Sequence, residues 1–434
     1  MRKWFNDRHF RSLIKNSGYL AASKAVAAVG GLISLALAGR GLGVVLFGLL
    51  ILVQSYVQAA SGLAKFNSWQ VVVRYGGPAL ATDDKQRFKL ATGFALGLDL
   101  ASGILSMAGA ILLLPVIGSW FGLPDDMLLY AAIYCLLIPT MGAGAPNGIL
   151  RALDRFDLLS WQGTVQANLR AVLTAIAWWQ GWDFLAYLAI WFISDLISDL
   201  VLWWLALREL KRRELLQGVK PTLKPGPLDQ AWKFAFTINL NSSINAAWGP
   251  ISRLLVGGLL GPTAAGLFRV ASSISDAAQR PSDFLNKAFY PEVMRLDHRT
   301  KKPWKLMWRA TALSAAVGAL MCLLVILLGE WLLRIVFGPG FADAYGVLVV
   351  LIGVPLVAMV SFPFPAMLHA LNQVTVPLIA NGFGILVYAG TVFPLVDRFE
   401  LIGAGLAFLL GKIAMAGYMA AALTVERRRR TATA

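Results

Sequence analysis

The chain has 434 residues, of which 58% are hydrophobic and 14% are charged, and its mean hydropathy is +0.65. These values lie far from those of soluble domains, so the composition predicts an integral membrane protein. Its 39 Lys and Arg residues give a net charge of +16. They lie between long apolar segments rather than on one soluble face, which argues against nucleic acid as a partner.

In chain order, the apolar segments predict twelve membrane-spanning helices, since each is close to or above the ~20 residues that cross a bilayer as a helix. The expected spans are residues 14–39, 44–73, 89–115, 127–150, 158–180, 184–208, 231–258, 264–293, 307–330, 344–370, 374–396 and 400–424. The longest hydrophilic connection divides the chain almost at its middle. We therefore expect an N-terminal six-helix lobe (1–212), a cytoplasmic linker (213–230), a C-terminal six-helix lobe (231–426) and a basic cytoplasmic tail (427–434).

Basic residues gather on every second connection between these spans. Thirty of the 39 Lys and Arg residues lie there, whereas the intervening connections hold only Arg40, Arg334 and Arg398. Cytoplasmic connections of membrane proteins carry the excess of Lys and Arg. The pattern predicts a multi-pass protein of the bacterial inner membrane with both termini in the cytoplasm.

The two halves of the sequence resemble each other. Leu42-Gly43 followed by Gly48-Leu49 recurs as Leu260-Gly261 followed by Gly266-Leu267, an offset of 218 residues. With six helices per half, both copies enter the membrane from the same side, so the repeat is parallel and its pseudo-twofold axis runs along the membrane normal. The predicted fold is an all-α membrane protein of two six-helix bundles that rock about a central cavity.

Polar side chains recur at helical spacing in the expected spans that would line this cavity. The second span has Gln54, Ser55, Gln58, Ser61 and Lys65, and the eighth has Arg269, Ser272, Ser273, Asp276, Gln279 and Arg280. The first span has Ser23 and Lys24, and the seventh has Asn239, Asn241, Ser242, Ser243, Asn245 and Arg253. Hydrogen bonds between helices are one interpretation. A water-filled cavity is the other, because long Gln, Lys and Arg side chains are costly in lipid.

The charges on these spans favour an anionic ligand. Lys24, Lys65, Arg253 and Arg269 are cations, and Asp276 is the only acidic residue near them on these helices. Arginine suits phosphate because its planar fork donates two parallel hydrogen bonds. Snorkelling of the lysines and an Arg269–Asp276 pair stay open as alternatives. The expected substrate-binding residues are Arg253, Arg269, Lys24, Lys65, Gln58, Asn241 and Asn245.

A second charged set combines Arg170 of the fifth span with Asp195 and Asp199, which are one turn apart on the sixth. A structural ion-pair cluster is one interpretation. The other is an H⁺ or Na⁺ site that drives transport, for which Asp99 of the third span is a similar candidate.

Several classes of catalytic site are disfavoured. The chain has only three histidines, and Cys135 and Cys322 both lie inside apolar runs, so we expect no metal and no cofactor. The stretch 405–412 differs from a phosphate-binding loop in its glycine spacing and has Ile413 where such a loop needs Ser or Thr. A polysaccharide polymerase or ligase would need large outer connections, which are short here. We expect a protein that is not an enzyme.

Short motifs at equivalent places in the two halves resemble a known family. Arg40-Gly-Leu-Gly-Val-Val-Leu-Phe47-Gly48 is similar to the turn between the first two helices of polysaccharide transporters in the multidrug/oligosaccharidyl-lipid/polysaccharide (MOP) superfamily, and Arg74-Tyr75 is similar to the pair that closes their second helix. Val44 replaces the usual proline, which the second copy keeps as Pro262.

This resemblance implies a MATE-like fold and a flippase for undecaprenyl-diphosphate-linked oligosaccharide, such as an O-antigen, capsule or exopolysaccharide unit. The expected partners are the lipid-linked oligosaccharide, membrane lipids and polysaccharide polymerase machinery. An ion-coupled drug or metabolite antiporter of the same superfamily is the alternative, and a membrane polymerase or ligase is the second alternative.

Overall fold

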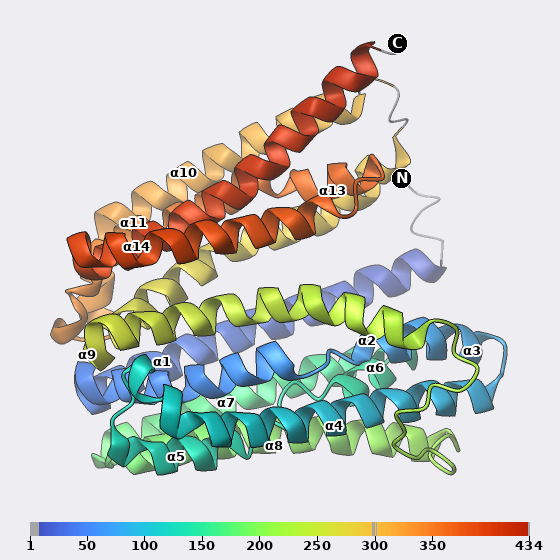
Figure 1. Cartoon of the computed structure of the whole chain (residues 1–434), viewed down its shortest axis with the longest axis horizontal. Coiled ribbons are helices and arrows are strands. Elements are labelled where there is room, and N and C mark those ends of the chain that lie inside the picture. The colour runs from blue at the N-terminus through green and yellow to red at the C-terminus, as the bar shows by residue number, and fades with distance from the viewer. Residues whose placement is uncertain (1–7, 297–299, 301, 433–434) are drawn as a thin grey trace. The chain divides into compact units, whose positions relative to one another are not determined.

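The structure is a computed structural model, and it describes residues 8–296, 300 and 302–432. Side chains are described between residues 25 and 429 apart from positions 241, 244, 247, 283, 284, 287, 288, 297–299 and 301. Helix makes up 86% of the structure, and the described residues contain no strand. Figure 1 shows long helices joined by short connections. The predicted all-α architecture is therefore confirmed.

The first two expected spans form one helical element, α1 (Arg8–Ala64), which is interrupted at Gly43. A straight helix of 57 residues would measure roughly 86 Å, far more than the ~30 Å of the bilayer core, so the chain must reverse within it. Gly43 provides the reversal with a φ of 69° and a ψ of 174°, a conformation that only glycine adopts readily.

The same backbone geometry recurs one repeat later. Gly261 interrupts α9 (Ala231–Arg295) with a φ of 84° and a ψ of 175°, and it lies 218 residues after Gly43. The motifs also meet in space, because a Cβ atom at Gly266 would lie 3.1 Å from the Cα atom of Gly48. The internal repeat read from the sequence thus has a counterpart in backbone conformation.

The described chain forms two compact units, residues 1–43 with 53–251 and residues 44–52 with 252–434. The lobe boundaries expected from the sequence stay a prediction. Beyond α1, the elements of the first unit are α2 (Trp69–Val71), η1 (Val72–Gly76), α3 (Gly77–Ala81), α4 (Lys85–Ile117), η2 (Ser119–Phe121), α5 (Asp125–Cys135), α6 (Gly144–Ala152), α7 (Phe156–Gln180), α8 (Phe184–Arg212) and the start of α9. Its core packs the 71–98 region against α6, α8 and the start of α9.

The second unit continues along α9 and contains α10 (Lys302–Val336), η3 (Pro339–Phe341), α11 (Ala344–Leu351), α12 (Gly353–Ser361), α13 (Pro363–Ala370) and α14 (Val376–Ala432). Glu400 interrupts α14 with a φ of 48° and divides it into the last two expected spans. The core of this unit packs the end of α9 against α10, α13 and α14.

The outer surfaces of both units are apolar. Leu105 and Leu112 on α4 are 72% and 76% exposed, and Leu313 on α10 is 72% exposed. Extended apolar surfaces of this kind are rare on soluble monomers and belong against lipid. Seven helical stretches of the described residues are long and apolar enough to span a membrane, namely Ala25–Ala81, Lys85–Ile117, Phe184–Arg212, Trp248–Ser282, Lys302–Val336, Ala344–Ala370 and Val376–Arg429.

Candidate functional site

The helices of the first unit are broken at two neighbouring places. α1 ends at Ala64 and the chain unwinds before α2, while the fourth expected span unwinds between Cys135 and Gly144. Lys65 joins the two breaks, because its Nζ donates hydrogen bonds to the carbonyl oxygens of Pro139 at 2.9 Å, of Ile138 at 3.4 Å and of Met141. In hydrocarbon, free carbonyl groups are costly, so the ammonium group stabilises a break that lipid alone would not tolerate.

Asp99 contacts the chain where the unwound segment ends and α6 begins. Its Oδ2 accepts a hydrogen bond from the backbone N–H of Ala145 at 2.7 Å, in the first turn of α6. Negative charge is favourable at a helix N-terminus, just as positive charge is favourable at a C-terminal end. Lys65 also acts electrostatically on Asp99 and on Asp199 of α8. The three residues therefore form one charge cluster around the unwound segment 136–143.

A polar pocket of about 160 Å³ opens beside this cluster, entirely within the first unit. Lys65 lines it while only 8% exposed, and Asn239 of α9 accepts a hydrogen bond from the backbone N–H of Asn67 at 3.1 Å. Within the described residues, the buried hydroxyl of Ser243 finds no hydrogen-bond partner. The other lining residues are Ser61, Gly62, Phe66, Met141, Gly142, Ser242 and Ala246. Such a pocket presents hydroxyl and amide groups to a polar ligand, beside the positive charge of Lys65.

Asp195 of α8 is fully engaged by neighbours. It forms an ion pair with Arg170 of α7, and it accepts hydrogen bonds from Tyr134 at 3.0 Å and from Gln166 at 2.6 Å. The Arg170 guanidinium also lies 4.8 Å from the ring centre of Trp191. Asp199 differs, because it lies beside Thr140 and forms no ion pair with any described residue. The structure thus brings Arg170 and Asp195 together and leaves Asp199 with the Lys65 cluster.

A separate group of charges lies in the second unit. Arg253 of α9 is only 6% exposed, and Arg269 and Asp276, which follow the interruption of α9 at Gly261, both act on it electrostatically. Asp276 is influenced in turn by four cations, Arg253, Arg269, Arg280 and Lys412. Arg280 belongs to the polar face expected on the eighth span, whereas Lys412 was not predicted from the sequence to belong to a site. Its signal was a single basic residue inside the apolar run of the last expected span.

The remaining predicted substrate-binding residues belong to neither of the two charge clusters described above. Gln58 is half-buried on α1, and Asn245 is exposed on α9. Lys24 and Asn241 lie on helices, but their side chains fall outside those that the structure describes. Asn239, Ser242 and Ser243, the neighbours of Asn241, line the polar pocket together with residues of the second expected span.

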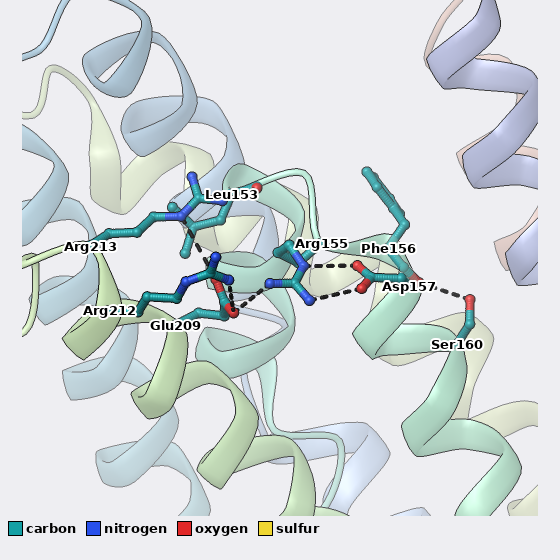
Figure 2. Close-up of polar contacts among 8 residues, drawn as sticks. All are labelled: Leu153, Arg155, Phe156, Asp157, Ser160, Glu209, Arg212 and Arg213. Atoms are coloured by element: carbon teal, nitrogen blue, oxygen red, sulfur yellow. Dashed lines mark hydrogen bonds and ion pairs between the residues drawn. The ribbon is translucent and has the colours of Figure 1, made fainter.

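The ends of α7 and α8 are joined by a network of ion pairs (Figure 2). Arg155 pairs with Asp157 at 2.8 Å and with Glu209, and Arg212 and Arg213 lie 3.6 and 3.8 Å from the same Glu209 carboxylate. The hydrogen bonds from Arg155 lower the pKa of Asp157, which precedes the expected fifth span. This network anchors the connection between α6 and α7 and lines none of the pockets described here.

Comparison with known proteins agrees with this architecture. Residues 13–296 match the family model described as polysaccharide biosynthesis protein. The chain is 41% identical to the inner membrane protein YghQ of Escherichia coli (strain K12) over 347 residues, which cover 80% of this chain and 98% of that protein.

Solved structures extend the agreement to the fold. An inward-facing multidrug resistance MATE family transporter of the MOP superfamily superposes with a TM-score of 0.67 at 16% identity, covering 95% of this chain and 94% of that one. A variant of the Vibrio cholerae MATE transporter VcmN gives 0.61 at 15% identity, with 96% and 98% covered. The chain therefore belongs to the polysaccharide biosynthesis protein family and is a multi-pass inner-membrane protein with the MATE fold.

Proposed function

We propose that this protein is a transporter of the flippase type, which moves an undecaprenyl-diphosphate-linked oligosaccharide from the cytoplasmic to the periplasmic leaflet of the inner membrane. The observation that supports the proposal is the charge cluster of the second unit, in which four cations all act electrostatically on the Asp276 carboxylate. A cluster of net positive charge inside apolar surroundings favours an anionic ligand. The guanidinium forks of Arg253 and Arg269 suit the oxygens of a diphosphate.

The polar pocket of the first unit supports the glycan part of the proposal. Its walls carry serine hydroxyls and asparagine amides, which are groups that exchange hydrogen bonds with sugar hydroxyls. Aromatic side chains form little of this lining, so a flat apolar drug finds few contacts there. A cationic drug would also be repelled by the charges around Asp276, which disfavours the antiporter alternative.

Transport then requires the predicted six-helix lobes to expose these groups to the two sides of the membrane in turn. The lipid tail stays in the bilayer while the diphosphate and sugars cross. Asp199 and Asp99 are the candidates for coupling to H⁺ or Na⁺, because Asp195 is already engaged by Arg170. Polysaccharide polymerase machinery that uses the delivered unit is the proposed downstream partner.

Delivery of lipid-linked glycan to the outer leaflet tests the proposal. Arg253→Ala and Arg269→Ala should each reduce delivery roughly tenfold or more, because a hydrogen bond to a charged group contributes about 1.5–3 kcal/mol. Arg→Lys should restore it only in part, since a point charge lacks the bidentate fork. Arg334→Ala is the matched control, because Arg334 is exposed on α10 and pairs with Glu330.

The assay compares periplasm-accessible glycan at equal protein abundance. Normal delivery in the Arg253→Ala, Arg269→Ala double variant would remove these residues from the mechanism. It would also remove the main argument for a diphosphate-bearing cargo.

A further inference from the structure

A second pocket of the first unit, of about 280 Å³, lies at the end of the second expected span, away from the polar pocket at Lys65. It has room for a group of several heavy atoms, because one water molecule takes about 30 Å³ of liquid volume. Two arginines, one from each side of the connection to α4, line it. The lining residues are Arg74, Tyr75, Pro78, Ala79, Thr82 and Arg87.

Arg74 is held in place by aromatic rings. Its Cζ atom lies 4.2 Å from the ring centre of Phe234 and 5.6 Å from that of Tyr75. Tyr75 is itself fixed, since its hydroxyl donates a hydrogen bond to the carbonyl oxygen of Asp229 at 2.7 Å. A guanidinium stacked on aromatic faces loses less conformational freedom when it binds a ligand than a free surface side chain does.

The local backbone is also unusual. Arg74 lies in η1, a five-residue π-helical turn between α2 and α3. Such turns are rare and are frequent at functional sites, because the additional residue redirects the side chains of one turn. Without this turn, a continuous α-helix would give Arg74 a different orientation.

The other polar groups of the pocket are already engaged. The Thr82 hydroxyl donates to the carbonyl oxygens of Pro78 and Ala79 at 3.2 Å. The Asp84 carboxylate, which is close in sequence, accepts the backbone N–H of Arg87 at 2.9 Å and caps α4. Neither Arg74 nor Arg87 forms an ion pair with an acidic residue in the described part of the chain. The pocket therefore offers two guanidinium groups and no competing carboxylate among its lining residues.

We propose that this pocket binds the phosphate or diphosphate group of a membrane lipid. Arginine pairs match phosphate oxygens through bidentate hydrogen bonds. The neighbouring Val73 is 37% exposed, so apolar surface adjoins the charged pocket, as a ligand with both a phosphate and a lipid tail requires. The inference rests on the proposed function in one respect. If the cargo is a diphosphate-linked lipid, this pocket is a subsite that binds the diphosphate headgroup of that cargo.

Equilibrium binding to the purified full-length protein in detergent tests this subsite. The probe is radiolabelled geranylgeranyl diphosphate, with geranylgeraniol as the probe that lacks phosphate. Arg74→Gln and Arg87→Gln should each weaken diphosphate binding about tenfold, as expected for the loss of a charged hydrogen-bond donor. Lys85→Gln is the matched control, because Lys85 is an exposed cation two residues from Arg87 that does not line the pocket. It should bind within twofold of the unaltered chain.

Competition then separates the sources of phosphate. Displacement by phosphatidylglycerol in nanodiscs, but not by inorganic pyrophosphate, assigns a lipid headgroup, and the reverse overturns the lipid part of the proposal. Equal affinity for geranylgeraniol, or equal weakening by Lys85→Gln and Arg74→Gln, overturns the subsite altogether. Binding is measured without transport, so its failure is distinct from a failure of glycan delivery in the Arg253 and Arg269 variants.

Discussion

Buried charged residues of the first unit are stabilised in two ways, by backbone groups or by a side chain of opposite charge. Lys65 donates to three backbone carbonyls and Asp99 accepts a backbone N–H, so both stabilise an interruption of helices inside the membrane. Arg170 and Asp195 instead stabilise each other, with Tyr134 and Gln166 completing the environment of the carboxylate. A buried charge persists only where partners of this kind surround it.

The Arg170–Asp195 pair predicts the effect of neutralising one partner. Asp195→Asn should lower stability by roughly 3–5 kcal/mol, because it strands the Arg170 charge in a buried environment. Asp199→Asn is the control, since Asp199 forms no ion pair with a described residue, and it should change stability far less. Thermal unfolding in detergent measures both. An Asp195→Asn protein that keeps its melting temperature but loses transport would instead make Asp195 an ion-coupling residue.

Helices approach one another closely where glycine removes a side chain. Gly93 and Gly97 of α4 lie under the 213–230 linker, and the Thr222 backbone N–H donates to the Gly93 carbonyl oxygen at 3.0 Å. A Cβ atom at Gly97 would overlap the Thr222 carbonyl group. The linker, although hydrophilic and rich in proline, is therefore packed against α4.

This contact predicts opposite effects of one substitution at two places on α4. Gly97→Ala should destabilise the first unit by about 1–3 kcal/mol through overpacking and should expose the linker before Val219 and Leu223 to thermolysin. Gly109→Ala should leave cleavage unchanged and stabilise the helix slightly, because nothing lies within 4 Å of its Cβ position and alanine favours helix. Limited proteolysis and thermal unfolding measure the difference. Equal cleavage of the two variants would contradict close packing of the linker.

For the whole molecule, an internal duplication accounts for the two similar chain reversals and for the distribution of Lys and Arg over the connections. The reversals at Gly43 and Gly261 have nearly the same torsions, and each follows the first helix of its repeat. Two parallel copies with the expected six spans each would return the chain to the side on which it began. The alternating Lys and Arg connections independently predict the same orientation.

The charge pattern predicts the orientation of the connections. Single cysteines at Gly181 and Gly338 should be labelled from the periplasm, and those at Lys220 and Arg428 only after the membrane is permeabilised. The background must lack the two native cysteines, so Cys135→Ala and Cys322→Ala are introduced first. Labelling at Lys220 in intact cells would overturn the assignment of both termini to the cytoplasm.

The sequence by itself determined which segments are helical and apolar, because the bilayer thickness and the cost of charge in lipid both constrain local composition. It also determined the internal repeat and the family, because the 218-residue offset and the short motifs are visible in the order of the residues. It also indicated Arg253, Arg269, Lys65 and Asp195 as unusual, since polar residues are rare in apolar runs. Tertiary structure alone decided their partners. The carbonyls that meet Lys65 lie more than seventy residues away, and Lys412 joins Asp276 from another helix. Such pairings depend on how unwound segments and distant helices pack, which composition and periodicity do not record.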